Sequence, residues 1–414
     1  MGRAGVAEPQ GSSVAEIRRI AIAGRVLPWW VAILGVYLVS RIVTTTFLVA
    51  MFAIATAENW TFASHRSNPD FFTFSGSWDA SFYKRIATEG YPTSIPTDSH
   101  GDVLPNAWAF LPLFPAIARG LMTVTGLGFY PAGVIVATVF GAAAALLLYR
   151  LVASRVGSIA GLWATIFFSF GPLSFVLQIA YAESLFFVLL FAALWAATAH
   201  RYWMIIPFGV AAAFTRPGAL AIPLMLAIVF IVRSMQARRG RVAGAAGFPM
   251  GERVAIVIAG AVTAVAGSAW PLIASGVTGF PGAYLETELS WWTGFVGRVA
   301  FVPLTPWFVL TMRYASVFGA LLVLGAIVGF VWILTRPSVR ALGIELVAFA
   351  ASYGLYIFAV FLPQQSLFRV LLPLSPLMGA PGLTHSRRAR TFVFVVGIAL
   401  QPVAIVLLWF LGYP

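Results

Sequence analysis

Two kinds of side chain in this sequence are suited to chemistry, and both stand where an apolar chain rarely carries charge. Asp79 follows Trp78 in the stretch "SGSWDASFYKRIATEG", which also holds the only lysine of the chain, Lys84. Arg216 and Arg369 stand within or between strongly apolar segments. A carboxylate can accept a proton as a general base, and a guanidinium can bind a phosphate in bidentate fashion.

Asp79 is predicted to lie on the apolar face of a helix. The segment from Trp78 onward has the pattern of an interfacial amphipathic helix, with Ser77 as its N-cap. At about 100° per residue, its apolar side chains share one sector, and Asp79 falls in the middle of that sector beside Tyr83. A carboxylate directed at a membrane or protein interior is costly unless it is paired or used. The alternative is an acid that only favours a helix N-terminus, which contributes about 0.3–1 kcal/mol.

The composition identifies the surroundings of these residues as a membrane. Apolar residues make up 60% of the chain and charged residues 9%, against roughly 25% charged in a soluble domain. The mean hydropathy is +0.92, and the net charge of +13 comes almost entirely from arginine. These arginines stand at the ends of apolar runs, as in membrane proteins, so nucleic-acid binding is not expected. The absence of cysteine from the sequence excludes disulfides and thiolate chemistry.

The sequence therefore predicts an all-α polytopic membrane protein with about 10–12 membrane helices. Two apolar segments, 203–215 and 218–233, are short and meet at "TRPG", where proline breaks the helix. They are predicted to form a broken or hairpin pair with Arg216 near its apex. The other apolar segments are 29–57, 108–126, 129–153, 158–179, 181–199, 254–277, 306–335, 341–361, 366–384 and 391–411.

The distribution of arginine orients the chain. If 108–126 is interfacial or re-entrant and the pair around Arg216 returns to the side it came from, 17 of the 26 basic residues lie in the cytoplasm. These 17 are Arg3, Arg18, Arg19, Arg25, Arg150, Arg155, Arg201, Arg233, Arg238, Arg239, Arg241, Arg253, Arg336, Arg340, Arg387, Arg388 and Arg390.

Residues 1–28 are then a cytoplasmic basic tail, and 29–411 form a single transmembrane domain. The first extracytoplasmic loop, 58–106, holds six of the thirteen acids, so the chemistry is expected on the outer side. A second outer loop, 278–305, carries "LETELSWW". Its acids are expected to be solvated, and its tryptophans are expected to belong to an interfacial belt rather than to a sugar-binding platform.

Five phrases occur in an order that resembles a known family. The chain resembles the PIG-V type of mannosyltransferase, the second mannosyltransferase of GPI-anchor assembly, and its bacterial relatives in the GT-C class. The phrases are "WDASFYKRIATEGYP" (78–92), "NAWAFLPLFP" (106–115), "QIAYAESLFFVLLF" (178–191), "AAFTRPGAL" (212–220) and "QQSLFRVLLPLSP" (364–376).

By this resemblance, the protein would be a GT-C-like glycosyltransferase of the cell membrane. It would transfer mannose from a polyprenyl-phosphate-mannose donor, with inversion, to a lipid-linked or glycan acceptor on the extracytoplasmic face. Such a transfer needs a base for the acceptor hydroxyl and positive groups for the leaving phosphate. Asp79 can be the base, and Arg216, Arg369 and Arg41 can hold the phosphate. Arg41 can instead be a structural partner for a buried acid.

The remaining candidate binding residues flank these charges. Trp78 and Tyr83 adjoin Asp79 on the predicted helix. Glu183 can bind the acceptor or pair with an arginine, or it can be an acid that only starts a helix. Gln364 and Gln365 can donate to and accept from sugar hydroxyls, or they can mark the wet end of a span.

No metal and no cofactor are expected. The segment "DSHGD", with Asp98, His100 and Asp102, offers ligands for a hard or borderline cation, but a solvated loop is the expectation. The alternative function is a multi-span lipid or sugar-lipid transporter or flippase, for which broken helices and buried arginines are natural. A transporter tends to show paired breaks in two halves, whereas this sequence shows one clear break.

Overall fold

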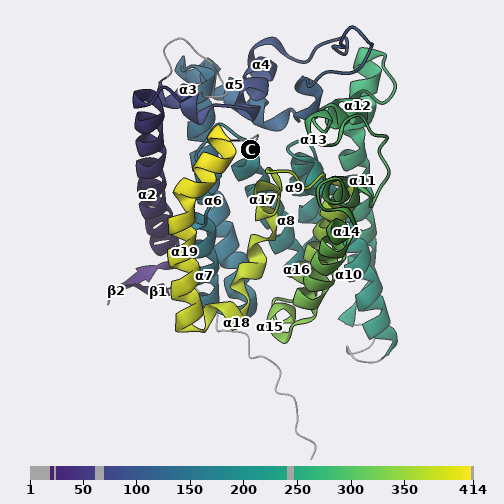
Figure 1. Cartoon of the computed structure of the whole chain (residues 1–414). Coiled ribbons are helices and arrows are strands. Elements are labelled where there is room, and N and C mark those ends of the chain that lie inside the picture. The colour runs from purple at the N-terminus through teal and green to yellow at the C-terminus, as the bar shows by residue number, and fades with distance from the viewer. Residues whose placement is uncertain (1–18, 23–24, 61–69, 240–246, 412–414) are drawn as a thin grey trace, which may run out of the picture.

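The structure is a computed structural model that describes residues 19–22, 25–60, 70–239 and 247–411 (Figure 1). Their regular secondary structure is helical apart from a two-stranded antiparallel hairpin of β1 (Arg19–Ile22) and β2 (Arg25–Pro28) and an isolated bridge between Thr97 and Val103. The all-α prediction is thus confirmed. Most of the predicted basic tail, 1–28, lies outside the described residues, and its last part forms the hairpin that the sequence analysis did not anticipate.

Six helices in the described part of the chain are long and apolar enough to cross a membrane. This confirms a multi-pass membrane protein, although fewer helices reach full length than the predicted number. They are α2 (Trp29–Ala57), α6 (Phe129–Val156), α10 (Ala221–Arg238) with the preceding 3-10 turn η4 (Pro217–Leu220), α11 (Met250–Thr278), α14 (Pro306–Thr335), and α19 (Arg387–Ile405) with the π-helical turn η7 (Val406–Phe410).

Three pairs of segments, the second of which includes the long helix α10, turn back within the molecule. The first pair is α7 (Ser158–Phe170) and α8 (Glu183–Thr198), with η2 (Ser174–Leu177) between them. The second joins η3 (Tyr202–Met204) and α9 (Ile205–Ala213) to η4 and α10, so the predicted break at Arg216 is confirmed. The third joins α15 (Pro337–Arg340) and α16 (Ile344–Val360) to α17 (Leu367–Val370), η6 (Leu372–Gly379) and α18 (Pro381–Thr384). At 1.5 Å per residue, α7 is about 20 Å long, well short of a bilayer core of about 30 Å.

The interpretation of 366–384 as one continuous apolar segment is wrong. Prolines at 373, 376 and 381 divide it into α17, η6 and α18. Each proline lacks the N–H that an α-helix needs and clashes with the preceding turn. The chain therefore returns to the basic end of the molecule in short turns, which leaves the α17 turn at mid-height in Figure 1.

Ion pairs join neighbouring helix ends at the arginine-rich end of the molecule. Arg155, at the end of α6, lies 3.7 Å from Glu345 at the start of α16. Glu252, at the start of α11, pairs with Arg233 of α10 and lies 3.6 Å from His200, which follows α8. These contacts bring together the arginine-rich ends that the sequence places in the cytoplasm.

The opposite end holds the short helices of the two acidic loops (Figure 1). They are α3 (Phe71–Ser75), α4 (Asp79–Glu89), the 3-10 turn η1 (Ala107–Ala109), α5 (Leu113–Thr125), α12 (Ala283–Ser290) and α13 (Thr293–Val296). At 13 residues α5 is too short to span. This agrees with the prediction that 108–126 is interfacial or re-entrant.

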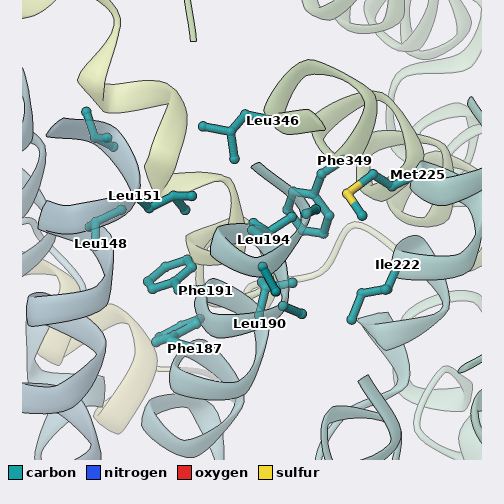
Figure 2. Close-up of a cluster of buried hydrophobic side chains, with 14 of the residues drawn as sticks. Leu148, Leu151, Phe187, Leu190, Phe191, Leu194, Ile222, Met225, Leu346 and Phe349 are labelled. Carbon is teal, nitrogen blue, oxygen red and sulfur yellow. The ribbon is translucent and has the colours of Figure 1, made fainter. Parts of the chain in front are cut away.

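A core of leucine and phenylalanine joins α6, α8, α10 and α16. Figure 2 shows Leu148 and Leu151 of α6 near Phe187 and Phe191 of α8, and all four side chains are buried. Because lipid tails are as apolar as these residues, close packing rather than the hydrophobic effect holds such helices together. The packed core fixes α8, α10 and α16, and these three helices carry the apices described next.

Candidate active site

A cavity of about 690 Å³ lies where α4 meets the apices of the inner segments. This volume is within the roughly 300–1,000 Å³ that is usual for ligand sites. Its walls come from α4, the η1 turn, the apex between α9 and η4, α11, α12 and the segment from α16 to α17. Asp79, Arg216 and Arg369 all line it, so residues far apart in the sequence face one space.

The start of α4 is held by another helix pair rather than by its own N-cap. The phenolic oxygen of Tyr181 accepts from the Asp79 backbone N–H at 3.3 Å and donates to the Ser77 carbonyl at 3.1 Å. The prediction of Ser77 as N-cap is wrong, because its hydroxyl donates to the carbonyl of Phe74 at 2.9 Å. Trp78 is at the N-cap position and has no side-chain oxygen to accept a hydrogen bond. Tyr181, two residues before α8, therefore supplies the capping oxygen.

Trp78 has a backbone conformation that side chains rarely adopt. Its φ is 58° and its ψ is −119°. Its indole N–H donates to the carbonyl of Trp409 at 3.4 Å, and Trp409 in turn donates to Phe74 at 2.8 Å. A non-glycine residue in such a region costs on the order of 1–3 kcal/mol and persists where surrounding contacts enforce it. Because of this backbone conformation, α4 begins abruptly at Asp79, which lines the cavity.

Four charged side chains meet at the inner part of the cavity. We call Asp79, Glu183, Arg216 and Arg369 the charge quartet. Arg369 Nη1 lies 2.6 Å from Asp79 Oδ2 and 3.1 Å from Glu183 Oε1. Arg216 Nη1 lies 2.6 Å from the same Glu183 oxygen. With two cations and two anions the quartet is formally neutral, which reduces the cost of burying it.

The quartet draws each member from a different element. Asp79 starts α4, Glu183 starts α8, Arg216 is the apex before η4, and Arg369 is in α17. Glu183 and Arg369 are the most buried, with 2% and 6% of their side chains exposed, against 18% for Asp79 and 20% for Arg216. The guanidinium of Arg369 also stacks over the Tyr181 ring at 5.1 Å.

The apices approach one another because Gly218 has no side chain. A Cβ at this position would lie 2.6 Å from a ring carbon of Tyr353. Tyr353 donates to the carbonyl of Val370 at 2.8 Å, so it ties the turn that follows Arg216 to the end of α17. The "TRPG" sequence thus provides both the helix break and the close approach.

Only some of the other predicted binding residues line the cavity. Trp78, Tyr83 and Gln364 line the cavity, whereas Gln365 is exposed and is not among its lining residues. Glu183 is not among the lining residues and pairs with both arginines, as one of its three predicted roles requires. Burial raises the pKa of the Tyr83 phenol above its ordinary value, so this hydroxyl is neutral and can donate a hydrogen bond.

Arg41 does not line the cavity. It is buried in α2, and its guanidinium donates to the Ser174 carbonyl at 2.6 Å, the Ser169 carbonyl at 2.9 Å and the Gln178 side chain at 3.1 Å. Its donors are thus directed at the turn between α7 and α8. The partners are carbonyl oxygens and the Ser40 hydroxyl rather than the buried acid considered as an alternative, so Arg41 is not included among the phosphate ligands proposed below.

Both acids of the outer loop segment "DSHGD" form ion pairs with an arginine. Arg298 lies 3.2 Å from Asp98 and 2.8 Å from Asp102, and it joins the first outer loop to the second. Backbone N–H groups of Asp102 and His100 lower the pKa of Asp98, and Arg298 adds to the effect. Within the described residues no group of three or more His, Asp or Glu side chains is arranged to hold a metal.

Glu288 and Trp291 line the cavity although neither was among the predicted site residues. Both line the cavity from the α12 side, so the expectation of a solvated acid and an interfacial tryptophan is wrong for them. Desolvation raises the pKa of Glu288 to about 7, and a hydrogen bond from Tyr284 and the charge of Arg216 partly offset the shift. The sequence "LETELSWW" alone does not indicate which face of this helix is buried against the rest of the protein.

Two solved structures of membrane enzymes align with most of this chain. The chain aligns with ArnT from Cupriavidus metallidurans in the apo state at a TM-score of 0.44 and 14% identity, over 88% of this chain and 64% of that chain. It aligns with the Archaeoglobus fulgidus oligosaccharyltransferase in complex with zinc and sulfate at a TM-score of 0.45 and 13% identity, over 89% and 52%. The chain therefore spans less than two thirds of either protein. No protein-family model and no curated protein matches it.

Proposed function

We propose that the protein is a membrane glycosyltransferase that transfers mannose from polyprenyl-phosphate-mannose to a hydroxyl of a lipid-linked or glycan acceptor. The supporting observation is that one cavity holds a carboxylate, Asp79, in contact with an arginine, Arg369, and next to a second arginine, Arg216. A base beside two phosphate-binding groups is what glycosyl transfer from a lipid phosphate needs. The acidic outer loops and basic opposite end support reaction on the extracytoplasmic face of the cell membrane.

In this mechanism, Asp79 takes the proton from the acceptor hydroxyl as its oxygen attacks the anomeric carbon of the donor. The new C–O bond forms on the face opposite the bond to phosphate, so the configuration inverts. The sugar–phosphate bond breaks, and polyprenyl phosphate leaves with the electron pair. Arg216 and Arg369 stabilise the negative charge that develops on the leaving phosphate.

The charge quartet has to rearrange for this to occur. Asp79 and Glu183 occupy Nη1 of Arg369 in the structure without donor. A phosphate that binds Arg369 would displace Asp79, which is the more exposed of the two acids. The displaced carboxylate would then be available to the acceptor hydroxyl, so donor binding and activation of the base are coupled.

A transfer assay tests the proposal. Purified protein in lipid nanodiscs is incubated with extracted membrane lipids and glycans and with one of two donors. One donor is polyprenyl-phosphate-mannose and the other is polyprenyl-phosphate-glucose, each radiolabelled in its sugar. We expect label in a new product from the mannose donor and loss of that product in Asp79→Asn. Glu89→Gln, an exposed acid on the same helix, is the matched control and should retain activity.

Transfer from the glucose donor alone would keep the reaction class and overturn the mannose assignment. Label that stays on the polyprenyl carrier, and crosses a sealed proteoliposome instead, would support the transporter alternative.

A further inference from the structure

The wall of the cavity formed by α12 and the two tryptophans after it has a different chemistry from the charge quartet. Glu288, Trp291 and Tyr284 line it, together with apolar side chains such as Leu289 and Phe301. It carries a single carboxyl group and no arginine or lysine among the described lining residues. A phosphate is therefore disfavoured at this wall, whereas an uncharged ligand with hydroxyl groups is not.

This wall is packed directly against the helix that carries Asp79. The Trp291 ring meets Phe82 of α4 at 5.4 Å and Phe110 at 6.2 Å between ring centroids, both edge-on. Such aromatic contacts hold a side chain in one orientation. Glu288 also interacts electrostatically with both Arg216 and Asp79. A ligand bound between the quartet and this wall would therefore touch both.

Two polar atoms of the cavity's lining residues are buried without a partner in the described part of the chain. They are Trp291 Nε1, a donor, and Gln364 Oε1, an acceptor. A buried polar group that lacks a hydrogen bond costs about 1–3 kcal/mol, so each of these two atoms requires an explanation. Both atoms have almost no accessible surface, so a ligand reaches them only when their side chains turn toward the cavity. One orphan donor and one orphan acceptor then fit a group that can both accept and donate, as a hydroxyl does.

We propose that Glu288 and Trp291 form a hydroxyl-binding subsite for a sugar ring, facing the phosphate-binding side of the cavity. The inference deepens the proposed function and rests on it for the identity of the sugar. A carboxyl group hydrogen-bonds a sugar hydroxyl, the indole N–H donates to a second oxygen, and the aromatic wall covers the apolar face of the ring. Gln364 completes the set from the α16–α17 side.

The surroundings of Glu288 suit this role. Tyr284 hydrogen-bonds it, Tyr356 lies near enough to interact with it, and Arg216 and Asp79 act on it from the other walls. Its raised pKa lets it hold a proton near neutral pH and so both donate to and accept from hydroxyl groups.

Binding measurements on purified full-length protein in nanodiscs test the subsite without relying on turnover. The probes are polyprenyl phosphate, polyprenyl-phosphate-mannose and methyl α-mannoside. The variants are Glu288→Leu and Trp291→Phe, and the matched control is Glu286→Leu, because Glu286 is exposed on the same helix. Loss of one hydrogen bond to a charged or strongly polar group corresponds to roughly tenfold weaker binding.

We expect Glu288→Leu to bind a mannose-bearing probe at least ~10-fold more weakly and Trp291→Phe about 3-fold or more, by the same hydrogen-bond range. Both variants should bind sugar-free polyprenyl phosphate as the wild type does. A loss confined to polyprenyl-phosphate-mannose assigns the subsite to the donor sugar, and a loss confined to methyl α-mannoside assigns it to an acceptor sugar.

Wild-type affinity of both variants for both mannose probes would overturn the subsite, as would equal losses for sugar-free polyprenyl phosphate. If the wild type binds methyl α-mannoside through Glu288 but does not bind polyprenyl phosphate, the proposed donor fails and the subsite stands. Should Glu288→Leu not fold, Trp291→Phe decides the question alone.

Discussion

The charge quartet makes an unusual prediction for Asp79→Asn: donor binding and turnover should change in opposite directions. Asparagine keeps the shape of the side chain and removes its charge and its basicity. In the structure Asp79 Oδ2 is 2.6 Å from Arg369 Nη1, where the donor phosphate is proposed to bind. The variant therefore loses the base and also loses a competitor for the arginine.

The magnitudes follow from the contacts. A general base contributes about 10²–10⁴-fold to rate, so turnover should fall at least ~100-fold. A charge-assisted hydrogen bond contributes about 1.5–3 kcal/mol, so donor affinity should rise by roughly tenfold to a hundredfold. Folding should survive because Glu183, 3.1 Å away, still compensates Arg369. The loss should stay below the 3–5 kcal/mol that is typical when a buried charge is left wholly uncompensated.

Two measurements on the same preparation decide the matter. Equilibrium titration with the polyprenyl-phosphate donor gives Kd, and a single-turnover experiment at saturating donor gives the rate of transfer. Thermal unfolding verifies the fold, and Glu89→Gln serves as the control. Weaker donor binding by well-folded Asp79→Asn would refute the idea of competition. Normal turnover would reduce Asp79 to a helix-end acid and remove the main support for an enzyme.

Three further predictions concern binding, topology and pH. Arg216→Gln and Arg369→Gln should each weaken donor binding by about 10-fold or more, and Arg369→Gln should lower Tm further because its side chain is 6% exposed against 20%; unchanged Kd in folded variants would contradict the phosphate role. In this cysteine-free chain, Ser94→Cys should react with an impermeant thiol reagent in whole cells and Thr335→Cys only after permeabilisation, and the reverse pattern would overturn the orientation. Burial raises the pKa of Glu288 from 4.5 to about 7, so the folded state binds more protons in that window and stability falls as pH rises through it. Glu288→Gln removes this loss, so its Tm advantage over the wild type should be larger at about pH 8 than at about pH 5, and a pH-independent difference would argue against the shift.

The residues of the site that could be predicted from the sequence are charged residues in apolar segments. Asp79, Arg216 and Arg369 stand in apolar or amphipathic segments, where the cost of burial makes each conspicuous. The break at Arg216 was also predictable, because proline has a local effect on a helix. The all-α membrane fold followed from composition for the same reason: the bilayer leaves few alternatives.

The parts that could not be predicted depend on contacts between distant segments. An acid in an outer loop looks the same in sequence whether it is solvated or faces a cavity, so Glu288 was not recognised. The capping of α4 by Tyr181 joins residues 102 positions apart, whereas capping rules use only neighbours, which is why Ser77 was chosen. Arg41 was conspicuous as a buried charge, but its partners are mainly carbonyls, which the sequence does not mark.

The location of the quartet on separate apices also constrains how the protein is made. Glu183 and Arg216 are 33 positions apart, so at about 5–20 residues per second the ribosome completes both within about 2–7 s of each other. Arg369 comes 290 positions after Asp79. Because an uncompensated charge is expensive in lipid, we expect Asp79 to reach its buried position only after α17 has been inserted. The cavity therefore gains Arg369, its last charged lining residue, late in synthesis, and we expect a nascent chain halted before residue 369 to hold every long helix up to α14 without the ion pair between Arg369 and Asp79.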